Sequence, residues 1–398
     1  MTPPGTAPTA TLAEGAFALA FGDMAVEAVL AMREAAAWCH LPAGPADRYR
    51  ALLAVADLDA FLLTDAARTP RVSMADGGRQ GSASVPADEF ALSSGHVDAP
   101  RLLARFDAGA SLVVSQFHEM HGPLARFCRG LEKLFLHAVQ CNVYLTPASA
   151  QGFRVHYDTH DVLVLQVEGE KQWRIWPGQP LPHPTRRTPW QRDVQPAGEP
   201  VEFTMTPGQA IYVPRGVLHE ARTQDSGGHS LHLTIGLMEP CWAEALRDTL
   251  TMLEPGVAAL REAFPSWRLG DPAAAPALLR AMATRLEALA SDATLEQLAV
   301  RMLDSLAQNR IPLPGRGLLT PPPGEADRLR LSDAMHHHVA ALPDGSAELR
   351  WADGALPLDE QGLDWLQRLD DGASAAELGE GALGFCRRLA AAGLLVAA

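Results

Sequence analysis

From residue 139 to residue 236 the hydrophobic pattern alternates with a period of two, and this alternation constrains the fold more than any other feature. The runs are short, rich in β-branched or aromatic residues, and bounded by Pro or Gly: VQCNVYLT, DVLVLQVEG, KQWRIWP, VEFTMTPG, QAIYVPRG and SLHLTIG. Successive side chains of such strands point to opposite faces, so each strand can bury one face. Strands of this length and spacing predict an all-β barrel or sandwich.

Segments with helical spacing precede and follow this β region. Residues 13–63 are rich in Ala and Leu, and residues 123–137 place apolar side chains on one face of a predicted helix. Residues 240–309 are again helical in pattern, for example in CWAEALRDTLTMLE. A proline-rich joint, IPLPGRGLLTPPPG, then separates a last module, for which we predict a helix, a short hairpin and two further helices. That order is compatible with a winged helix.

Three residues of the β region form a candidate metal site. His156 and Asp158 are separated by one residue in FRVHYDTHDVLV, so on an extended strand their side chains point to the same face. His219 follows a later strand and a Pro-Arg-Gly turn, which predicts a position at the rim of a barrel. Two histidines and one carboxylate on one side of a metal leave about three open positions, the arrangement of non-haem Fe(II) oxygenases. The sequence therefore predicts iron(II) at this site.

A chance match and a different third ligand are the alternatives to this metal site. The pattern H-x-D occurs by chance in many proteins, so its value depends on the surrounding strands and on the third residue. His160 lies four positions after His156 and is an alternative ligand. On a strand, that spacing carries it to the far end of the segment, and we therefore expect His160 to be a rim residue.

Lys171 is a candidate for binding an anionic co-substrate. The chain contains two lysines, Lys133 and Lys171, among its 33 basic residues, and Lys171 opens the aromatic strand KQWRIW. Oxygenases with this metal site usually consume 2-oxoglutarate, whose distal carboxylate requires a fixed cation inside the barrel. Asn142 and Tyr144 alternate to one face of the preceding strand and are candidates for hydrogen bonds to the same carboxylate. The alternative is a surface lysine beside a Glu-Gly turn, with Asn and Tyr packed in an ordinary strand.

Three consecutive histidines, His336, His337 and His338, form a second cluster with metal-binding potential. We place them in a helix, where successive side chains diverge by about 100°. Because that divergence prevents three neighbours from sharing one metal, we expect them to be solvated surface residues.

The composition bounds the partners and the compartment. A net charge of −14 opposes a large phosphate-binding surface, so we expect no nucleic-acid partner; it suits either a basic protein partner or simple solubility. No apolar run approaches the roughly 20 residues of a membrane span, and no basic-then-apolar leader opens the chain. The five cysteines are far apart and show no C-x-x-C pair, which favours a reducing compartment. We therefore expect a cytoplasmic protein without a membrane partner.

Taken together, these segments resemble one known family. The stretch CNVYLTPASAQGFRVHYDTHDVLVLQVEGEKQWRIW, with TPGQAIYVPRGVLHEA and SLHLTIG, is similar to the JmjC-type ribosomal oxygenases of the cupin superfamily. Members hydroxylate arginine or histidine side chains of ribosomal proteins in bacteria and eukaryotes. The resemblance is dense over residues 102–236. It implies the following roles: iron ligands His156, Asp158 and His219, and 2-oxoglutarate contacts Lys171, Asn142 and Tyr144.

The resemblance also implies an architecture, an α+β fold built on a double-stranded β-helix, the JmjC or cupin barrel. A helical flank with irregular strands is expected in residues 1–100 and the barrel core in residues 101–239. A helical dimerisation domain is expected in residues 240–315, and a winged-helix-like domain in residues 325–398. The chain is accordingly expected to form a homodimer.

The implied reaction is hydroxylation of a protein side chain, an arginine or histidine of a basic ribosomal protein, coupled to the decarboxylation of 2-oxoglutarate to succinate. Gly236 stands where some members of the family carry a hydroxyl residue near the co-substrate, so the ribosomal target does not follow automatically. Two alternatives stay open: a hydroxylase of a free amino acid or a natural-product peptide, and a non-enzymatic cupin-like binding module. The binding module is expected to have lost a ligand or the lysine, and this chain retains all four.

Overall fold

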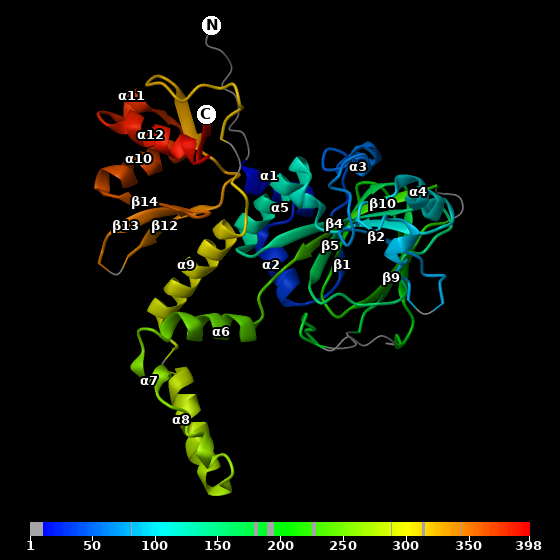
Figure 1. Cartoon of the computed structure of the whole chain (residues 1–398), viewed down its shortest axis with the longest axis horizontal. Coiled ribbons are helices and arrows are strands. Elements are labelled where there is room, and N and C mark those ends of the chain that lie inside the picture. Colours follow the sequence, from blue (N-terminus) through cyan, green and yellow to red (C-terminus); the bar gives the residue numbers. More distant parts are fainter. Residues whose placement is uncertain are drawn as a thin grey trace. The chain divides into compact units, whose positions relative to one another are not determined.

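The chain divides into two compact units, Met1–Glu239 and Pro240–Ala398 (Figure 1). The computed structural model describes residues 11–80, 82–178, 182–188, 195–224, 228–287, 289–312, 315–342 and 344–398. Residues 1–10, the start of the predicted N-terminal flank, lie outside the described residues.

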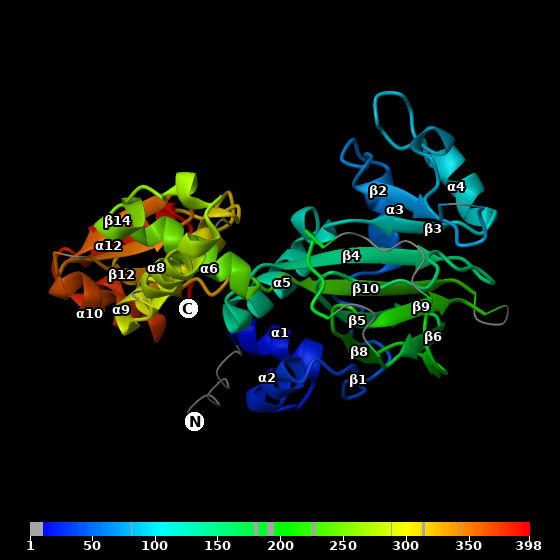
Figure 2. The same cartoon turned by 90° about the horizontal axis from the view of Figure 1, so that it is seen from below.

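In the described part of the first unit, two antiparallel sheets face each other (Figure 2). The larger has the order β1-β8-β5-β10-β4-β3-β2, and the smaller has the order β7-β6-β9. The strands of the larger sheet are β1 (Cys39–His40), β2 (Val72–Ala75), β3 (Ser111–Val114), β4 (Val139–Thr146), β5 (Asp161–Glu168), β8 (Ala210–Val213) and β10 (Ser230–Leu237). Those of the smaller sheet are β6 (Lys171–Trp176), β7 (Val201–Met205) and β9 (Leu218–Arg222). Two facing sheets of this kind form a double-stranded β-helix, which confirms the barrel predicted from the period-two pattern.

The strands β5 and β10, near the centre of the larger sheet, explain the continuous apolar runs of the sequence. β10 pairs with β4 on one side and with β5 on the other, and Thr234 lies opposite both Asn142 and Val164. β5 and β10 are buried along nearly their whole length, so both faces of these strands are covered. The inward residues of these strands form the walls of the barrel, and their outward residues face the helices.

Helices flank the larger sheet, as the helical spacing predicted. They are α1 (Leu12–Phe21), α2 (Val26–Glu34), α3 (Val55–Leu62), α4 (Ala99–Asp107) and α5 (Gly122–Phe135). α1 starts with a capping box between Thr11 and Glu14 and packs on α5. Gly130 permits this packing, since a Cβ there would lie 2.5 Å from the Leu12 carbonyl oxygen and from the Ala16 Cβ. Among the described residues no single helix is long and apolar enough to cross a membrane, and only α1 and α2 together, bent by 59°, pass that test.

The second unit begins with helices, as expected for residues 240–309. They are α6 (Trp242–Leu253), α7 (Ala258–Arg261), α8 (Ala275–Glu287) and α9 (Asp292–Gln308). Several large apolar side chains on this part of the chain are exposed: Trp242, Trp267, Leu269, Leu279 and Leu295.

The C-terminal part of this unit mixes strands and helices. It contains β11 (Arg328–Leu331), β12 (His337–Ala341), β13 (Ala347–Trp351), β14 (Gly354–Leu358), α10 (Glu360–Asp370), β15 (Ala373–Ser374), α11 (Ala375–Leu378), α12 (Ala382–Ala391) and β16 (Leu395–Ala397). Small three-stranded sheets form in the orders β15-β11-β16 and β12-β13-β14. They pack with α10 and α12 around a core that includes Trp365 and Phe385. The winged-helix assignment of this part stays a prediction.

The helix predicted around the three histidines is wrong. His337 and His338 belong to β12, which pairs with β13 from His337 opposite Trp351 to Ala341 opposite Ala347. These side chains are half-buried rather than solvated, and the His338 Nε2 atom lies 3.1 Å from Asp304 Oδ1 of α9. Pairing with β13 therefore outweighs the helical spacing that the segment shows locally.

Candidate active site

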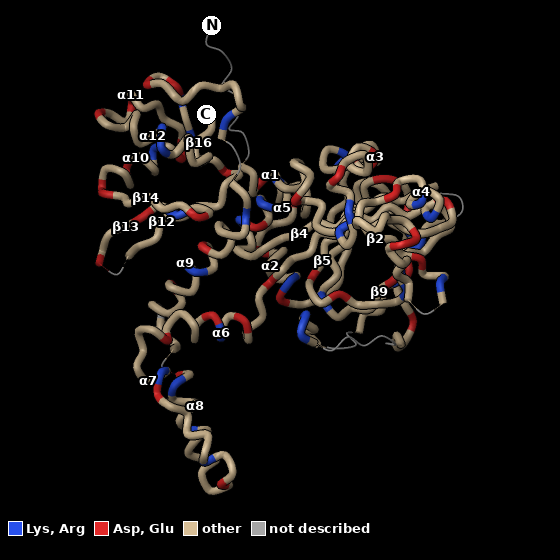
Figure 3. Tube along the Cα trace, in the orientation of Figure 1, with Lys and Arg blue, Asp and Glu red and all other residues tan. Residues whose placement is uncertain are grey.

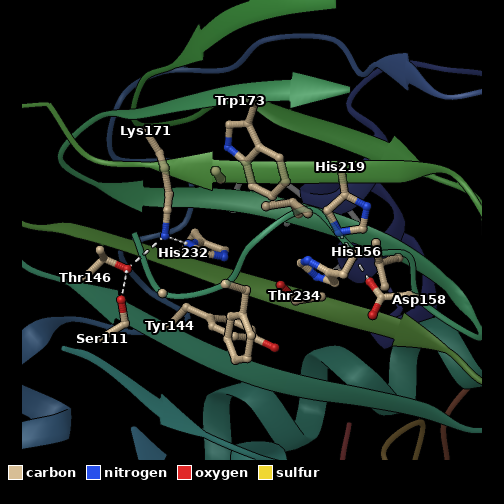
Figure 4. A pocket seen from close by; sticks show the side chains of 15 residues that line it. Ser111, Tyr144, Thr146, His156, Asp158, Lys171, Trp173, His219, His232 and Thr234 are labelled. Atoms are coloured by element: carbon tan, nitrogen blue, oxygen red, sulfur yellow. Dashed lines mark hydrogen bonds and ion pairs between the residues drawn. The ribbon is translucent and has the colours of Figure 1, made fainter. Parts of the chain in front are cut away.

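A cavity of about 270 Å³ lies between the two sheets (Figure 4). Its walls are formed by β4, β5, β6, β9 and β10, with further residues from β3 and from the segment that leads into β5. The lining side chains comprise polar, aromatic and aliphatic groups: Ser111, Tyr144, Thr146, Gly152, Phe153, His156, Asp158, Val162, Val164, Lys171, Trp173, His219, Ala221, His232 and Thr234.

The three predicted metal ligands meet at one end of this cavity. One ligand atom from each of His156, Asp158 and His219 lies within 4.8 Å of the others, and His219 Nε2 is 3.7 Å from Asp158 Oδ2. The segment before β5 runs along β9, because the backbone N–H of His156 donates to the His219 carbonyl oxygen at 3.0 Å. The reciprocal bond from the His219 N–H is 2.9 Å long. This pairing explains how residues far apart in the sequence come to share one site.

Both histidines are oriented by their Nδ1 atoms. His156 Nδ1 lies 2.7 Å from the Arg154 carbonyl oxygen, and His219 Nδ1 lies 2.9 Å from the Val217 carbonyl oxygen. Since a carbonyl oxygen only accepts, each Nδ1 carries the proton and each Nε2 keeps a lone pair for a metal. Burial, and secondly the neighbouring His156, lowers the pKa of His219 to about 4. Two imidazoles and a carboxylate are a donor set that fits divalent iron.

A hydrogen-bonded turn holds the two halves of the metal site together. The Gly216 N–H donates to the Asp158 carbonyl oxygen at 3.0 Å, in a turn where Gly216 has a positive φ of 84°. Asp161 Oδ1 accepts from the Arg215 N–H at 3.0 Å, and its Oδ2 accepts from the Tyr212 hydroxyl at 2.6 Å. Asp161 and Tyr212 were not predicted from the sequence, because only the pairing of β5 with β8 brings them together.

Lys171 lies at the other end of the cavity (Figure 4). Its side chain is buried, with 4% of the residue exposed, so the surface-lysine alternative is excluded. Its Nζ donates to Thr146 Oγ1 at 2.9 Å and lies 3.3 Å from His232 Nδ1. Among the described residues it has no carboxylate partner, and burial lowers the pKa of Lys171 to about 7. A buried ammonium without an anion is a costly arrangement that a bound carboxylate relieves.

The two other predicted co-substrate contacts differ in position. Tyr144 lines the cavity and stacks on the His232 ring, with centroids 4.9 Å apart and an interplanar angle of 4°. Asn142 is not among the lining residues; its Oδ1 accepts from the backbone N–H of Gln116 at 2.9 Å. The structure thus brings Tyr144, but not Asn142, into the cavity wall.

Three polar residues near Lys171 were not singled out from the sequence. Ser111 Oγ donates to Thr146 Oγ1 at 3.0 Å, and His232 lies opposite Tyr144 across the β4–β10 pair. Thr146 follows Tyr144 by two positions, so the period-two rule alone gives it the same face. That alternation predicts that Thr146 points to the same face as Tyr144, but not that it contacts Lys171.

His160 lies outside the metal cluster, so the alternative that it replaces one of the three ligands is not supported, and its position at the rim stays a prediction. Its imidazole packs on Gly236, where an added Cβ would lie 2.8 Å from the His160 Cδ2 and Nε2 atoms. The His160 ring therefore occupies the space that a side chain at position 236 would take. On this strand, β10, the hydroxyl group that lines the cavity belongs to Thr234, two residues earlier.

The barrel and its site define a JmjC domain, and residues 113–245 match the JmjC domain family. Ribosomal oxygenase 2 of Bos taurus is 34% identical over 273 residues, 63% of this chain and 57% of that protein. The bifunctional lysine-specific demethylase and histidyl-hydroxylase NO66 of Drosophila persimilis is 37% identical over 138 residues, 34% of this chain and 20% of that protein. Residues 113–245 thus form a JmjC domain that is similar to those of the ribosomal oxygenases, and the chain spans 57% and 20% of the length of these two relatives.

A solved structure supports the same fold. The E. coli ycfD structure superposes with a TM-score of 0.52 at 16% sequence identity, covering 86% of this chain and 90% of that one. At this identity the likeness concerns the fold alone.

Proposed function

We propose that the chain is an Fe(II)- and 2-oxoglutarate-dependent oxygenase that hydroxylates a side chain of a protein. One observation carries the proposal: a single cavity holds two histidines and a carboxylate at one end and, at the other, a buried lysine that no carboxylate of the described residues neutralises. A metal-bound keto acid with a second carboxylate is the kind of molecule that satisfies both ends. The JmjC domain match and the similarity to ribosomal oxygenases support the same proposal.

His156, Asp158 and His219 would hold the iron, and the bound metal would supply the activation of O₂ for the hydroxylation of a C–H bond. The carbonyl groups of Arg154 and Val217 keep both imidazoles in the tautomer that this requires. Apolar side chains such as Val162, Val164 and Trp173 line the cavity and limit the access of water.

Lys171 and Thr146 would hold the distal carboxylate of 2-oxoglutarate. Thr146 Oγ1 accepts from both Ser111 and Lys171, so its own hydroxyl proton is left to donate to another acceptor. Together the Lys171 ammonium and the Thr146 hydroxyl offer donors and positive charge to an anion. Tyr144 would border the co-substrate through its ring, and Asn142, two residues earlier on β4, stays a proposed further contact although it does not line the cavity.

The substrate we propose is an arginine or histidine side chain of a ribosomal protein. The names of the relatives, ribosomal oxygenase and histidyl-hydroxylase, motivate this choice. The net charge of −14 suits binding to a basic protein of this kind. With a ribosomal protein as the substrate, the proposed location of the activity is the cytoplasm. A free amino acid or a natural-product peptide is the second candidate, and a non-enzymatic cupin-like module is the third.

For the second unit we propose homodimerisation through residues 240–315 and a winged-helix-like domain in residues 325–398. The exposed Trp242, Trp267 and Leu279 support the first proposal, because large apolar groups of this kind usually find a partner surface. Acidic groups outnumber basic ones along the C-terminal part (Figure 3), with 13 Asp and Glu against 6 Arg in residues 325–398. This balance favours a protein contact over nucleic acid.

Incubation of the full chain with Fe(II), 2-oxoglutarate and peptides from basic ribosomal proteins tests the proposal. Mass spectrometry is expected to find one added oxygen on an arginine or histidine, with one succinate formed for each hydroxylation. An Asp158→Ala variant is the control and is expected to give neither product. Succinate formation with free amino acids but not with peptides would favour the second candidate. Absence of 2-oxoglutarate turnover with any substrate would favour the binding module.

A further inference from the structure

The ammonium group of Lys171 has two neutral partners inside the barrel, Thr146 and His232. We propose that His232 is a positioning residue that holds the Lys171 ammonium ready for the distal carboxylate of the co-substrate. This inference rests on the proposed function, and it assigns a role to a histidine that is no part of the metal site.

The chemistry of the contact fixes the state of the imidazole. A lysine ammonium only donates, so the His232 Nδ1 atom, 3.3 Å from Nζ, has to accept. The proton of a neutral ring then resides on Nε2. Burial, and secondly the charge of Lys171, holds the pKa of His232 well below its ordinary value, so the ring stays neutral beside the cation.

The ring of His232 is held firmly enough to act as a fixed acceptor. It stacks on Tyr144 and meets Trp173 nearly at a right angle, with centroids 5.9 Å apart and an interplanar angle of 77°. Its backbone lies on β10, between β4 and β5, so neither the strand nor the ring has room to swing. His232 is 5% exposed, and what remains of its surface lines the cavity.

Two fixed acceptors determine the direction of the third N–H bond of Lys171. Thr146 Oγ1 takes one bond and His232 Nδ1 takes another, so the remaining N–H is restricted to the side of the cavity. A lysine side chain has several rotatable bonds. Without these two acceptors, its conformational freedom would be lost only when the ligand binds, and this loss would weaken binding. His232 thus provides part of the ordering before the co-substrate arrives.

A neutral acceptor suits this position better than a carboxylate would. An Asp or Glu in place of His232 would pair with Lys171 and compete with the incoming dicarboxylate. Histidine orients the ammonium and leaves its charge available to the ligand.

Binding of 2-oxoglutarate to the full chain loaded with Mn(II), measured by calorimetry, tests this role without requiring turnover. His232→Leu is expected to weaken 2-oxoglutarate binding by about tenfold, the usual scale for one hydrogen bond to a charged group. Binding of pyruvate, which lacks the distal carboxylate, is expected to change by less than about twofold. His232→Asn keeps an acceptor near the place of Nδ1 and is expected to recover most of the loss, whereas His232→Gln, whose amide lies near the place of Nε2, is not.

A double-mutant cycle with Lys171→Met separates positioning from general damage. If His232 acts through Lys171, His232→Leu in the Lys171→Met background should cost less than about twofold. Additive losses, or an equal loss for pyruvate, would overturn the inference. Should the Leu variant fail to bind Mn(II), the Asn and Gln variants decide, and equal affinities for these two would also overturn it. If Lys171→Met itself leaves 2-oxoglutarate binding unchanged, the proposed co-substrate site fails instead.

Discussion

His156 and His219 exchange two backbone hydrogen bonds, of 3.0 and 2.9 Å, although several strands separate them in the chain. This exchange makes the segment before β5 a neighbour of β9 and brings the two imidazoles to a centroid distance of 4.4 Å. Asp158, two residues along the same segment, then reaches the same point. The metal site is therefore a product of one long-range strand contact and a local alternation of side chains.

Replacing His156, Asp158 or His219 by Ala is expected to weaken divalent metal binding by more than about 100-fold and to abolish 2-oxoglutarate turnover. The fold should persist, because apolar strands hold the barrel. Titration with Co(II) and thermal unfolding measure these effects. Glu220→Gln is the matched control, since Glu220 is adjacent to His219 but pairs with Arg174 outside the cavity, and it should bind metal normally. Full activity in Asp158→Ala would remove this site from consideration.

Removing the Lys171 cation is expected to raise the KM for 2-oxoglutarate at least about tenfold, or roughly 1.4 kcal/mol. The reason is that Lys171→Ala leaves the distal carboxylate buried without a cation. Lys171→Arg should be milder, because it keeps the charge but moves the donor. Metal affinity should hardly change in either variant. A KM near that of the wild type in Lys171→Ala would contradict the co-substrate assignment.

The barrel and the metal site were predictable because their signals are local. A period of two marks each strand, and H-x-D on a strand puts both side chains on one face. Lys171 was noticed because the chain has only one other lysine. In each case the prediction depends on a few residues that are neighbours in the sequence, and not on the pairing of distant segments.

The partners of Lys171 and the fold around His337 were not predictable in the same way. His232 and Thr146 reach Lys171 only because β4, β10 and β6 face one another across the barrel. No local pattern separates them from other inward residues of the same strands. The strand at His337 depends on pairing with β13, which the helical spacing of a single segment does not reveal.

Residues 240–315 are expected to mediate a homodimer at micromolar concentration, detectable by light scattering. The physical reason is the apolar surface that α6, α8 and the segment between them expose in the single chain. A charge on that surface, for example in Leu279→Glu, should shift the equilibrium to monomer without lowering metal binding. A wild-type chain that is monomeric at this concentration would refute the dimer.

The C-terminal part is expected not to bind duplex DNA. Arg328 and Arg350 are paired with Glu377 and Asp304, and the excess of acidic groups repels phosphates. Retention of the full chain on immobilised duplex DNA, tested over a range of salt concentrations, measures this. Salt-sensitive retention would contradict the expectation.

Affinity for 2-oxoglutarate is expected to fall as the pH rises above 7. In the empty site burial lowers the pKa of Lys171 to about 7, so the ammonium is mostly neutral at pH 8 to 9. A bound carboxylate favours the charged form, so binding at these pH values requires uptake of a proton. The affinity should therefore be greatest below pH 7 and fall by up to about tenfold per pH unit above it.

Lys171 is the group to which we assign this pH dependence, because the neighbouring titratable residues do not change their charge in this range. The pKa of His232 is lowered well below this range and that of Tyr144 is raised above it, so neither titrates between pH 7 and 9. Calorimetry with Mn(II)-loaded protein at pH 6.5, 7.5 and 8.5 gives the profile, and pyruvate should show none of the decrease, because it does not reach the lysine. Lys171→Arg supplies the second control: its guanidinium stays charged up to a pH of about 12, so its weaker affinity should be independent of pH here. A wild-type affinity that is flat or rises over this range would show that the ammonium is not the group that receives the carboxylate.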